Sequence, residues 1–154
     1  MSTLSDNPLR LDRQLCFALY SASRAITRAY APLLEPLGLT YPQYITLLVL
    51  WEEDGISVKH LGKRLGLDSA TLTPMLKRLE HQGSILRRRD PDDERVVRIG
   101  LTRSGRALEA KARRVPAALV CRAGYDLGKR DSMAELRALR DTLGALVARL
   151  EGGG

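Results

Sequence analysis

Two cysteines, Cys16 and Cys121, are the side chains of this sequence best suited to redox chemistry. A thiolate can be oxidised to a sulfenic acid, which a second thiol converts into a disulfide. The two cysteines lie 105 positions apart, and in a reducing compartment such a pair is not a structural disulfide by default. Buried, unreactive thiols are the simpler interpretation, so a reactive pair needs a further argument.

Metal and cofactor chemistry is not indicated by the remaining candidates. The possible zinc ligands are Cys16, Cys121, His60 and His81, and no two of them stand at the spacing of paired ligands. We therefore expect no metal and no cofactor. A chain of 154 residues also fits a single domain, with no room for a separate catalytic domain of ordinary size.

Small polar and cationic side chains form a second set with a defined chemistry. The formal net charge is +7 and the isoelectric point is about 9.8, which favours a polyanionic partner. One face of a helix predicted from Ser69 onward combines small side chains with hydrogen-bond donors and cations, as a DNA major groove requires. This face comprises Ser69, Ala70, Thr71, Thr73, Lys77 and Arg78.

Further cations are expected around this face. They are Lys63, Arg64, Arg87, Arg88, Arg89, Arg95 and Arg98. Among them we assign Arg88 and Arg95 to DNA contact, and Arg95 follows an acidic loop from which a guanidinium could enter a narrow minor groove. The alternative is that Arg95 pairs with Asp92 or Asp93 and stiffens the loop.

The apolar pattern predicts the helices that would carry these residues. A long helix is expected over 12–34. A second helix opens at Tyr41-Pro42 and ends before Gly55, with an apolar stripe of Tyr44, Leu47, Leu48 and Trp51. Two short helices over 58–65 and 69–82, capped by Ser57 and Asp68 and joined by Gly66, are typical of a helix-turn-helix. A helical hairpin without a DNA role stays an alternative.

The second half predicts a wing and a dimer contact. Strand-like runs over 84–89 and 95–101 predict a β-hairpin, and Thr102 caps a helix to about Arg122 that is interrupted near Pro116. A final helix repeats apolar residues in steps of three and four, which is typical of a dimer contact, although a monomer could bury them against the first helix. These residues are Leu136, Leu139, Leu143, Leu146 and Leu150.

We therefore expect a mainly helical chain with a small β-hairpin wing, that is, a winged helix-turn-helix homodimer. The single domain would span 1–154, with dimerisation helices at about 11–35 and 103–150 and a DNA-binding part at about 57–101. No apolar run approaches the roughly 18 residues that span a bilayer, so we expect a cytoplasmic protein without membrane contact.

The sequence resembles the MarR family of winged-helix repressors and, within it, the organic-hydroperoxide-sensing OhrR subfamily. The resemblance covers nearly the whole chain. Its matching segments are Leu15-Cys16-Phe17-Ala18-Leu19-Tyr20, Leu39-Thr40-Tyr41-Pro42-Gln43-Tyr44, Leu67 to Arg78, and Asp93-Glu94-Arg95. It is also the reason to continue the helix from Ser69 through Pro74, because proline in an ordinary helix interior costs roughly 3 kcal/mol.

The resemblance implies a MarR-like homodimer that represses transcription from palindromic operator DNA. The residue matching Cys16 is the peroxide-reactive thiol of that family, and the tyrosines matching Tyr20, Tyr30 and Tyr41 surround it or rearrange on oxidation. Tyr20 is four residues after Cys16 and so shares its helical face, where its hydroxyl or that of a partner tyrosine could hydrogen-bond the thiolate. A late cysteine, here Cys121, closes an intersubunit disulfide in the two-cysteine members.

Two other functions stay open at this point. A MarR-type repressor could sense a small aromatic ligand in the dimer cleft, with both cysteines incidental. A thiol peroxidase would also use a reactive cysteine, but the chain has no Thr-x-x-Cys arrangement, and the helix-turn-helix would have no purpose there. We expect a regulator and not an enzyme.

Overall fold

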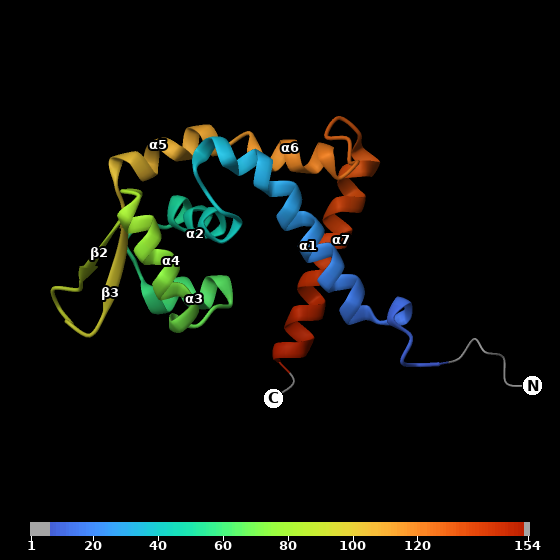
Figure 1. Cartoon of the computed structure of the whole chain (residues 1–154), viewed down its shortest axis with the longest axis horizontal. Helices are drawn as coiled ribbons and strands as arrows, with labels where there is room; N and C mark the ends of the chain where they lie inside the picture. The colour runs from blue at the N-terminus through green and yellow to red at the C-terminus, as the bar shows by residue number, and fades with distance from the viewer. Residues whose placement is uncertain (1–6, 153–154) are drawn as a thin grey trace, which may run out of the picture. The chain divides into compact units, whose positions relative to one another are not determined.

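The computed structural model describes residues 7–152 and is mainly helical, as expected. Its elements are η1 (Leu11–Arg13), α1 (Leu15–Leu34), η2 (Glu35–Leu37), α2 (Tyr41–Glu52), β1 (Ile56–Ser57), α3 (Val58–Leu65), α4 (Ser69–His81), β2 (Ile85–Arg89), β3 (Val97–Leu101), α5 (Arg103–Ala112), α6 (Val115–Arg122) and α7 (Arg130–Glu151) (Figure 1). The chain divides after Arg113 into two compact units, which we call the N-terminal and C-terminal units.

Helix α2 lies at the centre of the N-terminal unit because it is apolar on nearly every side. A capping box fixes its start: the Gln43 amide N–H donates to Thr40 Oγ1, and the Gln43 side chain accepts from the Thr40 N–H at 2.9 Å. The expected stripe was partly wrong, since Leu48 is exposed and Trp51 is only half-buried. The core is formed by Leu34, Tyr44, Leu47, Leu50, Leu61, Leu72, Leu76, Leu79, Ile85 and Ile99.

The sheet has three antiparallel strands in the order β1-β3-β2. The predicted hairpin is present, with Arg87 opposite Ile99 at its centre. The hairpin alone was an incomplete description, because Ile56 and Ser57 form a third strand that pairs with Ile99 and Arg98. This short strand attaches the start of α3 to the base of the wing.

The helix boundaries differ from the prediction at one place and agree at two others. The helix expected over 12–34 begins at Leu15, because Gln14 has an extended backbone that separates it from the 3-10 turn η1. Helix α4 continues through Pro74, as the family resemblance predicted. The interruption expected near Pro116 is also present: α5 ends at Ala112, and α6 starts with this proline in its first turn.

The C-terminal unit consists of α6 and α7. Gly124 has a left-handed φ of 87° and ends the turn after α6, and Ser132 Oγ accepts from the Asp126 N–H at 2.7 Å near the start of α7. No residue of α7 is buried. Its exposed large apolar side chains are Leu139, Leu143, Val147 and Leu150.

Candidate nucleic-acid interface and redox site

Helices α3 and α4 form a helix-turn-helix whose tight turn depends on glycine. Gly66 closes α3 with a left-handed φ of 64°. A Cβ on Gly62 would lie 2.7 Å from the Leu67 carbonyl oxygen, closer than real Cβ contacts, so the bare backbone lets the turn fold against α3. The turn thereby brings the start of α4 close to α3.

Side-chain caps fix where both helices begin. Ser57 Oγ accepts from the His60 N–H at 3.1 Å, and Asp68 Oδ1 accepts from the Thr71 N–H at 2.8 Å. The hydrogen bonds from the Thr71 backbone and side chain hold the pKa of Asp68 below its usual value, so this cap is charged at neutral pH. Both caps agree with the sequence prediction.

Helix α4 presents the predicted DNA-facing residues on one exposed side. Ser69, Ala70, Thr71, Thr73, Lys77 and Arg78 are all exposed. The opposite side, formed by Leu72, Met75, Leu76 and Leu79, is buried in the core. Within the described residues, Lys77 and Arg78 make no ion pair. The exposed side therefore carries small groups near the helix start and two unpaired cations further along.

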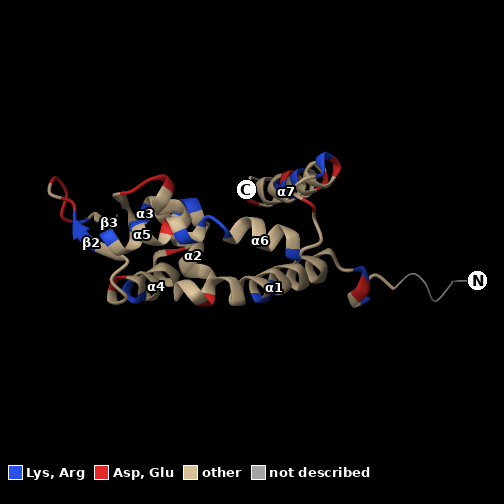
Figure 2. Cartoon of the chain, turned by 90° about the horizontal axis from the view of Figure 1, so that it is seen from above, with Lys and Arg blue, Asp and Glu red and all other residues tan. Residues whose placement is uncertain are grey.

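The wing is a hairpin with cations on its strands and an acidic tip (Figure 2). Arg88, on β2, is exposed and makes no ion pair with any described residue. The Arg95 side chain is 91% exposed, and its Nε and Nη2 donate to the two oxygens of Asp93 at 3.0 and 3.2 Å. These bonds lower the pKa of Asp93. The alternative of a pair with Asp93 is thus present, and it leaves the guanidinium facing solvent.

A groove of about 620 Å³ lies between the helix-turn-helix and the wing. This groove was not predicted from the sequence. Its walls include Lys59 on α3, Thr73 on α4 and Arg87 and Arg95 on the hairpin. Residues far apart in the sequence form these walls, so no local pattern could have indicated the groove.

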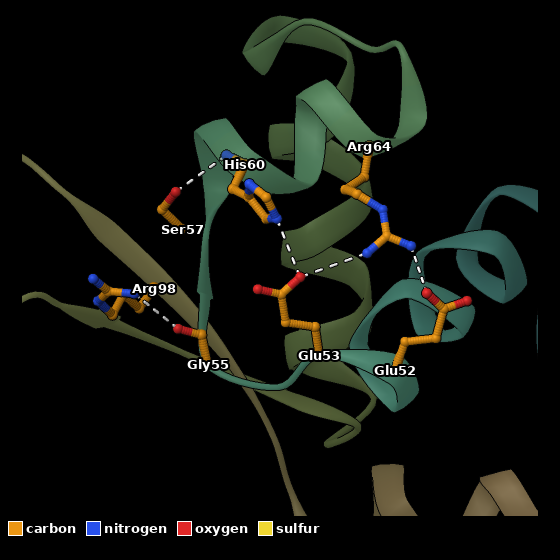
Figure 3. Close-up of polar contacts among 7 residues, drawn as sticks. All are labelled: Glu52, Glu53, Gly55, Ser57, His60, Arg64 and Arg98. Atoms are coloured by element: carbon orange, nitrogen blue, oxygen red, sulfur yellow. Dashed lines mark hydrogen bonds and ion pairs between the residues drawn. The ribbon is translucent and has the colours of Figure 1, made fainter.

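Several cations that the sequence groups around the interface are held by other groups. Arg64 donates to Glu52 at 2.5 Å and lies 3.5 Å from Glu53, which also contacts His60 Nε2 at 3.2 Å (Figure 3). Arg87 donates to Glu80, Arg89 donates to the Glu94 carbonyl, and Arg98 donates to Asp90 and to the Gly55 carbonyl. These arginines therefore differ from Arg88, which makes no ion pair with any described residue.

The two cysteines are exposed, which contradicts the simpler interpretation of buried core thiols. Cys16 lies in the first turn of α1 beside Leu15, Phe17 and Tyr20, which are also exposed at 62%, 37% and 58%. Cys121 lies on α6 and belongs to the C-terminal unit. The first cysteine thus lies among apolar and aromatic side chains that the described chain leaves partly exposed.

Two of the three predicted tyrosines, Tyr30 and Tyr41, have rings in contact, and Tyr44, which the prediction omitted, contacts Tyr30 as well. The ring centroid of Tyr30 is 4.9 Å from that of Tyr41 and 5.5 Å from that of Tyr44. Burial raises the pKa of Tyr30 to about 12, with smaller contributions from Tyr44 and Tyr41. Tyr20 has a different contact: its hydroxyl accepts from Arg24 at 3.2 Å, with the guanidinium 5.4 Å from the ring centroid.

Comparisons with known proteins identify the family. The family model of the transcriptional regulator SarA/Rot matches residues 28–111. The organic hydroperoxide resistance transcriptional regulator of Bacillus subtilis is 47% identical over 92% of this chain and 92% of its own length. This chain belongs to the MarR/SarA family of winged-helix regulators. The regulator TtmR of Methylorubrum extorquens is 50% identical to this MarR/SarA chain, over 95% of it and 75% of TtmR.

Solved structures agree with the fold of this MarR/SarA regulator. Reduced AbfR bound to DNA is 38% identical, with a TM-score of 0.68 over 90% of this chain and 95% of AbfR. Disulfide-formed AbfR has a TM-score of 0.65 at 38% identity, over 90% and 92% of the two chains; AbfR is from Staphylococcus epidermidis. MarR itself has a TM-score of 0.78 at 25% identity, over 96% of this chain and all of the MarR chain.

The family is one of transcriptional regulators and not of enzymes. Between residues 7 and 152, no group of three or more histidine, cysteine or acidic side chains is placed to hold a metal ion. Over the same residues, none of the helices of this MarR/SarA regulator combines the length and the apolar character needed to cross a membrane.

Proposed function

We propose that this MarR/SarA regulator is a redox-sensing transcriptional repressor that binds palindromic operator DNA as a homodimer and is released when an organic hydroperoxide oxidises Cys16. The observation that carries the proposal is the exposed Cys16, set among apolar side chains, in a chain that also exposes the polar and cationic side of α4. The Bacillus subtilis relative is an organic hydroperoxide resistance regulator, which supports this oxidant class.

DNA binding rests on α4 and the wing. The exposed side of α4, from Ser69 to Arg78, enters the major groove, where small residues permit close approach and donors contact base edges. Arg88 contacts phosphate, and Arg95 reaches the minor groove from the hairpin tip, oriented by Asp93. AbfR has been solved on DNA in its reduced and its overoxidised forms, which supports DNA binding through this fold.

The dimer is supported by apolar side chains that the described chain leaves partly exposed. Leu15 and Ile26 on α1 and Leu143 and Leu150 on α7 are exposed at 39 to 75%. A second copy would remove such surface from water. Helices within 11–35 and 103–150 thus form the dimer contact, the DNA-binding part spans about 57–101, and the two α4 helices meet half-sites on one face of the duplex.

The redox step proceeds at sulfur. The Cys16 thiolate attacks one peroxide oxygen, the O–O bond breaks, and the alkoxide leaves as an alcohol after taking a proton, which gives a sulfenic acid on Cys16. The thiol of Cys121 of the partner subunit then attacks this sulfur, so that an S–S bond forms and water leaves. The Cα atoms of a disulfide lie within about 7 Å, so the helices carrying the two thiols are held together and the half-site spacing changes.

The test measures DNA release and covalent linkage together. The probe is a duplex selected by the reduced wild-type protein from a random 30-base-pair library, and the oxidant is cumene hydroperoxide. Wild-type protein is expected to release the probe, whereas Cys16→Ser stays bound. On a non-reducing gel, wild-type protein forms a covalent dimer and Cys121→Ser does not. Retention of DNA by oxidised wild-type protein, or a covalent dimer of Cys121→Ser, would overturn the corresponding step.

A second candidate function, sensing of a small aromatic ligand, is favoured by a mostly apolar groove of about 780 Å³ beside Tyr41, Pro32 and Pro42. Alkylation of Cys16 separates the two candidates. Loss of DNA binding on alkylation supports the thiol sensor, whereas unchanged binding supports ligand sensing.

A further inference from the structure

The side chain of Glu80, in the last turn of α4, binds Arg87 on strand β2. Arg87 Nε and Nη2 donate to Glu80 Oε2 at 2.9 and 2.7 Å, and the Arg87 backbone N–H donates to Glu80 Oε1 at 3.3 Å. Both carboxylate oxygens of Glu80 therefore bind Arg87, through its side chain and its main chain. These bonds lower the pKa of Glu80, so the carboxylate is charged at neutral pH.

This pair is less exposed than the Arg95–Asp93 pair at the tip of the wing. The side chains of Arg87 and Glu80 are 28% and 34% exposed, whereas Arg95 is 91% exposed. Successive side chains of a strand point to opposite faces. Arg87 is thus directed to α4, while its neighbour Arg88 is exposed and makes no ion pair in the described part of the chain.

The Glu80–Arg87 pair lies where α4 joins the wing, so it can fix the orientation of the wing relative to α4. Between the end of α4 and β2 lies only the short turn at Gln82–Ser84, in which Gly83 has a left-handed φ of 78°. Arg87 stands at the centre of β2 opposite Ile99, and both strands lead from there to the tip that carries Arg95. Arg87 also lines the groove between α4 and the hairpin.

We propose that Glu80 and Arg87 form a strut that sets the angle between the DNA-facing helix α4 and the wing, so that both are positioning residues for DNA binding. This rests on the proposed DNA-binding function and deepens it. With its charge matched by Glu80, Arg87 does not neutralise a phosphate and releases no counterion on binding. Its effect reaches DNA through the placement of Arg95, because major-groove and minor-groove contacts form together only at one angle.

The substitution Glu80→Gln distinguishes this strut from a phosphate contact by the sign of its effect. If Arg87 bound phosphate, removal of a nearby carboxylate would free its charge and strengthen DNA binding. The strut predicts the opposite: affinity for the selected 30-base-pair duplex falls roughly tenfold, which is the scale of one charge-assisted hydrogen bond. The slope of log affinity against log salt concentration, called the salt slope below, stays unchanged. Glu52→Gln is the matched control, because it removes a carboxylate from α2, outside the proposed dimer and DNA contacts. Arg64 keeps Glu53 as an ion partner, so affinity is expected to stay unchanged.

Two further variants cover the case in which Glu80→Gln alters folding. Arg87→Lys keeps the charge but loses the planar fork, so a strut is weakened whereas a phosphate contact survives. In an Arg95→Ala background, Glu80→Gln is expected to cause no further loss, because the wing contact that the strut positions is already gone. All affinities are measured well below the melting temperature of each variant.

Each outcome has a defined meaning. Tighter binding by Glu80→Gln, wild-type affinity of Arg87→Lys, or a full additional loss in the Arg95→Ala background overturns the strut. Failure of the wild-type protein to select any duplex from the library overturns the proposed DNA-binding function instead. The two failures are therefore distinguishable.

Discussion

Gly105 lies where the start of α5 crosses the turn between α4 and β2, and substitution by alanine is expected to destabilise the chain. A Cβ at this position would lie 2.0 Å from the Ser84 carbonyl oxygen and 3.2 Å from Leu101 Cδ2. The obstacle at Ser84 is backbone, so it cannot rotate away. The two segments must separate by more than about 1 Å to reach an ordinary contact distance.

The cost follows from the hydrogen bonds at this crossing. The Ser84 oxygen accepts from the Thr102 N–H at 3.1 Å, and the Gly105 oxygen accepts from Trp51 Nε1 at 3.0 Å. Loss of these two bonds costs about 1 kcal/mol each, and overpacking adds about 1–3 kcal/mol. Alanine has a higher helix propensity than glycine, which offsets this destabilisation by up to about 1 kcal/mol. The net loss is about 2–4 kcal/mol, or a melting temperature roughly 10 °C lower.

The assay is thermal unfolding followed by far-UV circular dichroism at one fixed protomer concentration, because association would make the midpoint concentration-dependent. Gly100→Ala is the matched control, since its new Cβ would meet nothing nearer than Asp54 Oδ1 at 3.9 Å. It is expected to be neutral or slightly stabilising. If Gly105→Ala melted within about 2 °C of the wild type, the inferred close contact at Ser84 would be refuted.

Three further predictions concern a half-buried tyrosine, a helix cap and a wing cation. Burial raises the pKa of Tyr30 to about 12, so the folded chain retains a proton that the unfolded chain loses. Stability therefore falls by about 1–2 kcal/mol from pH 10 to 12, and equal urea midpoint shifts in wild type and Tyr30→Phe would contradict this. Thr40→Ala removes the α2 capping box and costs about 1 kcal/mol in urea unfolding; an unchanged midpoint would show that the cap contributes nothing. Arg88→Ala weakens binding to the selected duplex and reduces the salt slope by about one, and an unchanged slope would exclude a phosphate contact.

The helix starts could be predicted because their signals are local. Ser57, Asp68 and Thr102 each accept from a backbone N–H three residues later, as the sequence indicated. The side chain, its acceptor atom and the amide that it binds all lie within four residues, so tertiary packing is not needed to specify them. The exposed side of α4 follows in the same way from helical periodicity.

Contacts between distant residues could not be predicted in this way. The strand at Ile56–Ser57 has two residues and exists only through pairing with Ile99 and Arg98, more than 40 positions later. The exposure of Leu48 depends on which elements pack around α2. Such features are determined by the assembled fold, and a short apolar segment does not specify its own partners.

The same limit applies to the candidate site. Charge and spacing placed Arg87 and Arg88 together, but only the fold shows that one binds Glu80 and the other faces solvent. The ring of Tyr44 on α2 contacts that of Tyr30 on α1 because these two helices pack against each other.

Strand β2 occupies one edge of the sheet, with β3 as its sole neighbour in the described chain. An edge strand presents backbone donors and acceptors that another molecule could pair with, which is a route to aggregation. Arg88 and Arg89 are exposed on this strand, and their charge repels a second copy of the same strand. Replacing both to alter DNA preference would therefore also remove protection against self-association of the unbound protein at high concentration.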